Sequence, residues 1–183
     1  MTSCLLQFDH VGANPYSLAE ITIATDNFKI QIGKGGFGPV YYGKLENGQE
    51  VAIKVLDVKS SQGPFEFFNE VNVLSRVSHR NLVSLIGYCL EDNQQTLIYE
   101  YMHKGSLYDH LYGDSSTSAN EQLDWTTRLH IALNASQGLK YLHSGCNPSI
   151  IHRDLLIQHY QIERLGTYVI GNCHPMCGTQ SYS

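Results

Sequence analysis

Residues 32–40 are IGKGGFGPV, a run that fits the pattern G-x-G-x-x-G-x-V through Gly33, Gly35 and Gly38. Because glycine has no Cβ, the backbone amides of such a run can close around phosphate oxygens. Ordinary glycine-rich hairpins have the same spacing, so the run alone is a weak signal. A dinucleotide-binding turn is the other chemical interpretation, with Asp57, 19 residues after Gly38, as the ribose-binding acid.

The segments around the glycines decide between these interpretations. Residues 28–32 alternate between apolar and polar side chains, which predicts a strand, and residues 40–42 are again extended. Asn47-Gly48 is a typical hairpin turn, and residues 50–56 form the next predicted strand. A capping box at residues 17–20 predicts a short helix before them. The glycines therefore bend an antiparallel meander, which excludes the dinucleotide turn because that turn must open a helix.

Lys54 lies on the strand after the hairpin, 16 residues after Gly38, in the run VAIK. A strand lysine that faces a phosphate loop can reach the α- and β-phosphates as a point charge. The helix predicted over residues 64–77 offers an anion to hold it. Glu70 lies next to the apolar face of that helix and is the expected partner, whereas Glu66 is less favourably placed.

The rest of the chain is predicted to contain both strands and helices. Residues 82–89 and 96–101 are two further strand-like runs, and residues 106–109 indicate the start of a capped helix. Residues 125–143 form a helix that is nearly apolar all round, so we expect it to be buried on most sides. Residues 155–183 show no sustained period, and no regular element is predicted there.

Composition excludes several classes of protein. The chain has 183 residues, 42% of them hydrophobic, and a formal net charge of −5, which is typical of a globular protein and argues against a nucleic-acid binder. No stretch approaches the about 18–20 apolar residues of a membrane span. Five cysteines without a regular framework indicate free thiols, so we expect a cytoplasmic protein that reaches membranes only through partners. Cys173, His174 and Cys177 offer three soft ligands where closed zinc sites have four, so no metal site is predicted.

The run His152-Arg153-Asp154 follows the long helix, and an aspartate there could accept a proton from a hydroxyl as a general base. A glycine loop, a strand lysine, a helix glutamate and H-R-D in this order resemble the protein kinase family. The closer resemblance is to plant receptor-like kinases of the Pelle/interleukin-receptor-associated group. It covers about residues 16–154 and rests on the runs YSLAEITIATDNF (16–28), HRNLVSLIGYC (79–89), YEYM (99–102) and LDWTTRLHIALNASQGLKYLH (123–143).

The resemblance implies an α+β, protein kinase-like fold. Its first lobe would be an antiparallel five-stranded sheet with one αC helix, and its second lobe would be helical and incomplete. The implied parts are a juxtamembrane-like segment (1–27), the N-lobe and hinge (28–102), a partial C-lobe up to the catalytic loop (103–154) and a tail outside the family (155–183).

The resemblance also implies roles for residues. Asp154 would accept the proton of a substrate hydroxyl, and Lys54, paired with Glu70, would steer the phosphates. Val40 and Ala52 would sandwich the adenine, Tyr99 would be the gatekeeper, and residues 100–102 would form the hinge. The complete implied nucleotide site is Ile32, Gly33, Gly35, Gly36, Gly38, Val40, Ala52, Lys54, Tyr99, Glu100 and Met102.

The family pattern breaks after Asp154. Leu156 stands where the family has lysine, His159 stands where it has asparagine, and neither D-F-G nor A-P-E follows. Mg²⁺ is expected for the family, but the asparagine and aspartate that would hold it are absent.

We therefore predict an ATP-binding, receptor-like protein kinase domain of the serine/threonine type, truncated just after H-R-D. Its expected reaction is transfer of the γ-phosphate to hydroxyls of a protein substrate, weakly or not at all. One alternative is a catalytically silent nucleotide-binding or scaffold fragment that binds a partner kinase. The other is a mis-spliced product without a function of its own.

Overall fold

The computed structural model describes residues 12–35, 38–56, 64–91, 94–112, 123–151, 160–164 and 167–170. The chain forms two compact units, one of Met1–Arg76 with Ser84–Tyr101 and the other of Val77–Val83 with Met102–Ser183. The division in the second half of the chain therefore falls between Tyr101 and Met102.

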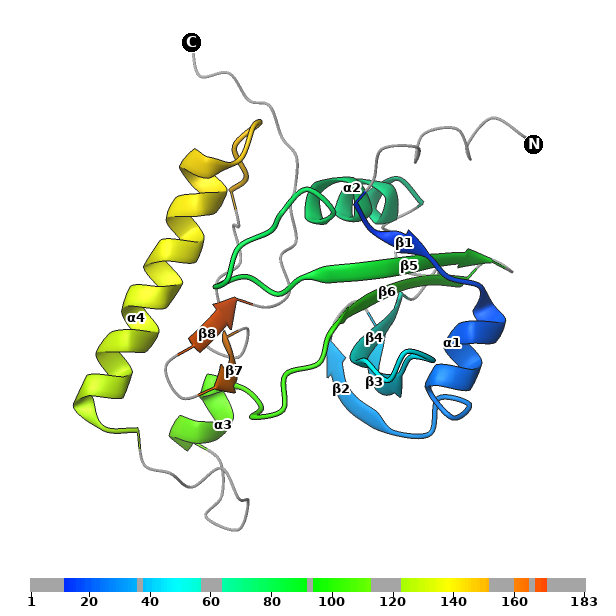
Figure 1. Cartoon of the computed structure of the whole chain (residues 1–183), viewed down its shortest axis with the longest axis horizontal. Coiled ribbons are helices and arrows are strands. Elements are labelled where there is room, and N and C mark those ends of the chain that lie inside the picture. The colour runs from blue at the N-terminus through cyan, green and yellow to red at the C-terminus, as the bar shows by residue number, and fades with distance from the viewer. Residues whose placement is uncertain are drawn as a thin grey trace. The chain divides into compact units, whose positions relative to one another are not determined.

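The first unit is built on a six-stranded sheet with the order β1-β5-β6-β4-β3-β2 (Figure 1). Its elements are β1 (Asn14–Pro15), α1 (Leu18–Ala24), β2 (Gln31–Gly35), β3 (Gly38–Lys44), β4 (Glu50–Leu56), α2 (Pro64–Leu74), β5 (Leu85–Glu91) and β6 (Gln94–Glu100). Strands β2 to β6 pair in the antiparallel manner that the sequence predicts. The sixth strand, β1, was not predicted and pairs with β5 in parallel.

The hairpin between β3 and β4 follows the predicted turn. The Gly48 amide donates to the Leu45 carbonyl at 2.8 Å, and the Gln49 amide donates to the Asn47 side chain at 2.9 Å. Gly48 has φ +85°, a backbone conformation in which glycine avoids the steric cost of a Cβ. The turn therefore lies at the predicted residues, and the prediction is confirmed.

Helix α1 begins with the capping box that the sequence predicts. The Glu20 amide donates to Ser17 Oγ at 3.2 Å, and the Ser17 amide donates to the Glu20 carboxylate at 2.7 Å. The hydrogen bonds that the Ser17 amide and hydroxyl donate to the Glu20 carboxylate lower the pKa of Glu20. The helix lies against β3 and β5 (Figure 1) and inserts Ile21 into a buried cluster. The other buried members of this cluster are Leu45, Val51, Ile53, Cys89 and Ile98.

Helix α2 covers the opposite face of the same sheet. Its buried Phe67 meets the ring of Tyr88 on β5 edge-on, with the centroids 6.3 Å apart. Tyr88 lies opposite Leu97 on β6, whereas the α1 cluster contains the next residue, Ile98. Successive strand residues point to opposite faces, so the two helices sandwich the sheet.

The second unit contains α3 (Leu107–Tyr112), α4 (Trp125–Lys140), the π-helical turn η2 (Tyr141–Gly145), β7 (Tyr160–Arg164) and β8 (Thr167–Ile170). Asp124 caps α4 by accepting a hydrogen bond from the Thr127 amide at 2.7 Å. The antiparallel hairpin of β7 and β8 corrects the sequence analysis, which predicted no regular element in that region. Within the described residues, no helix is both long and apolar enough to cross a membrane.

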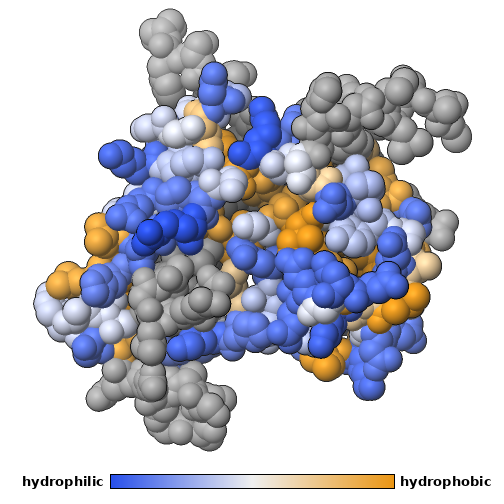
Figure 2. All heavy atoms as spheres, in the orientation of Figure 1, coloured by the Kyte–Doolittle hydropathy of each residue, from blue (hydrophilic) through white to orange (hydrophobic). Residues whose placement is uncertain are grey.

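The expectation that α4 is buried on most sides is wrong. Its buried residues are Ile131, Asn134, Ala135 and Gly138, which recur at helical spacing and so form one face. Ile131 packs against Leu107 of α3, and β8 also contacts α4. Trp125, Leu129 and Leu133 are 74%, 52% and 53% exposed. Figure 2 shows apolar patches on the part of the surface that α4 forms.

Candidate nucleotide site

The register of three neighbouring strands aligns the predicted site residues in a row. Gly33 of β2 lies opposite Val40 of β3, and Val40 lies opposite Lys54 of β4. Directly opposite residues of antiparallel strands lie on the same face of the sheet. The position of Gly33 and the side chains of Val40 and Lys54 therefore lie on one face. This is the face that α2 covers, because Lys54 also lies opposite Leu97.

A second row runs beside the first on the same face. Ala52 lies two residues before Lys54 and opposite Tyr99 of β6. Val40 and Ala52 are both half-buried, so each keeps part of its apolar surface accessible. Two half-buried apolar side chains can contact a flat, apolar ring. A charged group attached to that ring can then reach the neighbouring lysine.

Lys54 and Glu70 form a buried ion pair between β4 and α2. The lysine Nζ lies 3.7 Å from Glu70 Oε1, and both side chains are 6% exposed. Charges so deeply buried persist only with a partner. The structure thus brings together the two residues that the sequence pairs, although they come from different elements.

Tyr99 contributes a contact that the sequence analysis did not predict. Its hydroxyl donates a hydrogen bond of 2.9 Å to Glu70 Oε1, the same oxygen that faces Lys54. The bond joins residues 29 positions apart and is buried. The sequence places Tyr99 on a strand and Glu70 on a helix, but only the register of the sheet brings them into contact.

The end of β6 is tied to neighbouring strands by its backbone. The Glu100 amide donates to the Ser84 carbonyl at 3.3 Å, and the Tyr101 amide donates to the Glu50 carbonyl at 3.4 Å. Tyr42 donates its hydroxyl to the Glu50 side chain, which raises the pKa of Tyr42, and its ring meets that of Tyr101 edge-on at 5.0 Å. Any base bound along this edge must use polar groups other than these two amides.

The glycines differ in how strongly the backbone requires them. Gly38 has φ +129°, which L side chains rarely adopt, and it lies opposite Gly35 where β2 meets β3. Ile32, beside Gly33, is 41% exposed. Gly36 lies outside the described residues.

The described residues of the first unit do not include the remaining predicted residues. Met102 belongs to the second unit and is buried. Asp154 lies outside the described residues, as do Leu156 and His159. The described part of the chain holds no group of three or more His, Cys, Asp or Glu residues that could bind a metal ion.

Comparison with known families identifies the chain. The profile of the family described as "Protein tyrosine and serine/threonine kinase" matches residues 27–170. The chain belongs to the protein kinase family. The match extends 16 residues beyond Asp154, from 154 to 170, and so reaches further than the resemblance described from the motifs.

Individual relatives are receptor-like kinases of plants. The chain is 55% identical over 139 residues to a probable LRR receptor-like serine/threonine-protein kinase of Arabidopsis thaliana, which covers 76% of this chain and 15% of that protein. It is 46% identical over 173 residues to the nodulation receptor kinase of Pisum sativum, covering 92% and 18%. The chain thus spans less than a fifth of the length of these relatives. It is a kinase domain related to those of receptor-like serine/threonine kinases.

Solved structures agree with this assignment. A pseudokinase determined in its apo form superposes with a TM-score of 0.78 at 25% identity, covering 89% of this chain and 60% of that one. The pseudokinase named drought responsive inactive kinase 1, bound to ENMD-2076, gives the same TM-score and identity, covering 88% and 62%. The predicted kinase-like α+β fold is therefore confirmed. The family as a whole uses ATP and Mg²⁺ and acts on proteins.

Proposed function

We propose that this kinase domain binds ATP on the face of the first sheet that carries Lys54. The observation that supports the proposal best is the buried Lys54–Glu70 pair, with 3.7 Å between Nζ and Oε1. Glu70 keeps the ammonium group in place at the end of the row from Gly33 and Val40. A fixed positive charge beside a glycine strand suits a nucleotide phosphate.

The other predicted residues would complete the nucleotide site. Val40 and Ala52 would both contact one side of the adenine, because they lie on the same face of the sheet, with Ile32 next to the glycines. Because the amides of Glu100 and Tyr101 already donate to Ser84 and Glu50, adenine would use the carbonyls of this segment and the Met102 amide. Gly33 and Gly35 would allow the backbone to approach the phosphates closely.

The expected reaction is phosphoryl transfer to a protein hydroxyl. The hydroxyl oxygen would bond to the γ-phosphorus, the bond from that phosphorus to the bridging oxygen of ADP would break, and Asp154 would take the hydroxyl proton. The residues of this chain do not fit the family's Mg²⁺ site, because His159 replaces the asparagine that would hold the ion. Leu156 replaces the lysine that would stabilise charge on the transferring phosphoryl group. We therefore expect slow transfer or none.

Calorimetry of ATP binding, with and without Mg²⁺, tests the nucleotide site. Lys54→Met should weaken binding about 10- to 100-fold, the usual effect of losing a hydrogen bond to a charged group. Lys44→Met is the matched control, because Lys44 is an exposed lysine on β3. If Lys54→Met binds ATP as tightly as the unaltered chain does, the proposed site is wrong.

A second candidate function is a catalytically silent scaffold that binds ATP and a partner kinase. It is favoured by the two pseudokinases of similar fold and by the residues at positions 156 and 159. Transfer of labelled γ-phosphate separates the two functions. Activity that Asp154→Asn abolishes would establish an enzyme, whereas ATP binding with no transfer above that of Asp154→Asn would establish the scaffold.

A further inference from the structure

A left-handed turn connects α1 to β2. Asp26, Asn27 and Phe28 have φ values of +48°, +59° and +56°. Three successive non-glycine residues rarely adopt this conformation, because each Cβ crowds its own backbone. Such a turn persists only where surrounding contacts hold it.

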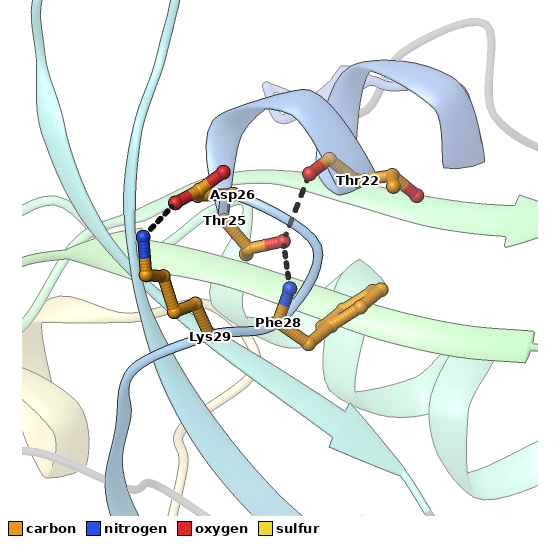
Figure 3. A network of polar contacts seen from close by, with 5 residues as sticks. All are labelled: Thr22, Thr25, Asp26, Phe28 and Lys29. Carbon is orange, nitrogen blue, oxygen red and sulfur yellow. Dashed lines mark hydrogen bonds and ion pairs between the residues drawn. The ribbon is translucent and has the colours of Figure 1, made fainter.

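The hydroxyl of Thr25 provides such contacts (Figure 3). Thr25 is 2% exposed, and its Oγ1 accepts a hydrogen bond of 3.0 Å from the Phe28 amide. The same hydroxyl lies 2.8 Å from the Ile21 carbonyl and 3.3 Å from the Thr22 carbonyl, to which it can donate its proton. One buried group therefore ties the last turn of α1 to the third residue of the left-handed turn.

The remaining contacts of the turn are weaker or come from the backbone. The Lys29 amide donates to the Thr25 carbonyl at 3.2 Å. Lys29 and Asp26 form an ion pair of 2.6 Å (Figure 3), but their side chains are 68% and 75% exposed. Exposed pairs stabilise little, so the buried hydroxyl is a stronger restraint than this ion pair.

The turn leads directly into the glycine strand. The Phe28 ring meets Tyr41 of β3 edge-on at 5.3 Å, and Tyr41 lies opposite Gln31, the first residue of β2. The Tyr42 amide donates to the Ile30 carbonyl at 2.9 Å. Among the strands that the structure describes, β2 is the last in the order of the sheet and pairs with β3 alone. An edge strand bonded on one side depends strongly on how its first residues are held.

We propose that Thr25 is a positioning residue for the nucleotide site. Its hydroxyl holds the left-handed turn, the turn sets the place of Phe28 against Tyr41, and Phe28 fixes the start of β2. The expected effect of this hydroxyl on ATP affinity rests on the proposed ATP site. Its expected effect on the position of β2 rests on the described contacts alone.

Three variants of the full chain separate the hydroxyl from general stability. Thr25→Val keeps the shape and removes the hydroxyl, and Thr25→Ser keeps the hydroxyl. Thr22→Val is the matched control, because Thr22 lies on the same helix. Among the described contacts, its hydroxyl donates only to the Leu18 carbonyl, at 2.8 Å. Each variant is examined by amide hydrogen exchange and by ATP affinity.

A hydrogen bond of this kind usually changes an equilibrium about two- to tenfold. In Thr25→Val we expect the exchange protection of residues 31–35 and of the Tyr42 amide to fall by about that factor, with β5 and β6 unchanged. ATP affinity should fall by a similar factor. Thr25→Ser should restore both quantities, and Thr22→Val should alter neither.

Two results would overturn the inference. One is unchanged protection of β2 in Thr25→Val, and the other is an equal loss across β2, β5 and β6, which would mean a merely structural role. If Thr25→Val does not fold, Phe28→Leu replaces it, since it keeps the hydroxyl and removes the ring contact with Tyr41. That variant must show the same local loss in β2, and full protection there would also refute the inference.

The failure of this inference is distinguishable from failure of the proposed function. If the unaltered chain binds no ATP, the proposed nucleotide site is wrong. Hydrogen exchange in β2 then decides by itself whether the Thr25 hydroxyl positions the strand.

Discussion

Replacement of Lys54 by methionine should destabilise the first unit as well as weaken ATP binding. The Lys54 Nζ and Glu70 Oε1 atoms lie 3.7 Å apart, and both side chains are 6% exposed. Unit charges at that distance attract by about 4–5 kcal/mol at an effective dielectric constant of about 20. Removing one partner of a buried pair costs about 3–5 kcal/mol, because the other charge stays buried. Since Tyr99 still donates to Glu70, we expect a loss of about 3 kcal/mol.

A double-mutant cycle measures this value. Urea unfolding of Lys54→Met, Glu70→Leu and the combined variant gives the coupling free energy between the two side chains. The combined variant should be more stable than Lys54→Met, because two apolar side chains replace the pair. It should stay about 1–2 kcal/mol below the unaltered chain, because Tyr99 loses the hydrogen bond to Glu70. Lys44→Met should shift the free energy of unfolding by less than about 0.5 kcal/mol.

The choice of signal matters for this measurement. The only tryptophan of the chain is Trp125, and it lies in the second unit, so its fluorescence does not report on the sheet of the first. Circular dichroism or hydrogen exchange in β4 and β6 is the suitable probe. If Lys54→Met unfolds within about 0.5 kcal/mol of the unaltered chain, the argument from burial is refuted. A combined variant as unstable as Lys54→Met would show that an unpaired Glu70 is not the cause.

Three further predictions concern the packing and titration of other residues. Ile98→Ala should lower the free energy of unfolding by about 2–5 kcal/mol because Ile98 is fully buried, whereas Ile23→Ala, at an 81% exposed position, should change it by less than about 0.5 kcal/mol in the same urea titration. Gly87→Ala places a Cβ 2.5 Å from the Asn14 carbonyl oxygen, so β1 must shift. Hydrogen exchange should then show that the Tyr16 amide, which donates to the Tyr88 carbonyl, loses protection. Retained protection of that amide would contradict this prediction. Burial and the charge of Arg80 lower the pKa of His79 in the folded chain below its ordinary 6.5. As the pH drops from about 7, the unfolded chain therefore takes up the proton first. The free energy of unfolding should then fall until the pH has passed the folded pKa. His79→Gln should reduce that slope in unfolding titrations, and an unchanged slope would exclude His79 as its source.

Much of the local structure could be predicted because it depends on residues a few positions apart. The capping box of Ser17 and Glu20 and the Asn47-Gly48 turn each form within one short segment. The strand over residues 50–56 has the predicted bounds for the same reason. The kinase motifs then indicated the fold, which the family match confirms.

Contacts between distant segments explain what the sequence did not predict. The predicted strand starts at residue 28, but β2 starts at Gln31 because the turn held by Thr25 puts Phe28 in a left-handed conformation. The Tyr99–Glu70 hydrogen bond depends on the register of β4 and β6, which no local pattern specifies. Likewise, the apolar composition of α4 gives no information on which face the neighbouring elements cover.

The packing of α1 on the sheet gives this chain an internal probe of its own motion. Cys89 carries a thiol with 0% exposure, in the same buried cluster as Ile21. A thiol reagent can reach it only when the helix lifts away or the sheet opens. In a variant in which Cys89 is the sole cysteine, the labelling rate would therefore report how often the segment before the kinase strands detaches. That rate could be followed as nucleotide or a partner protein is added.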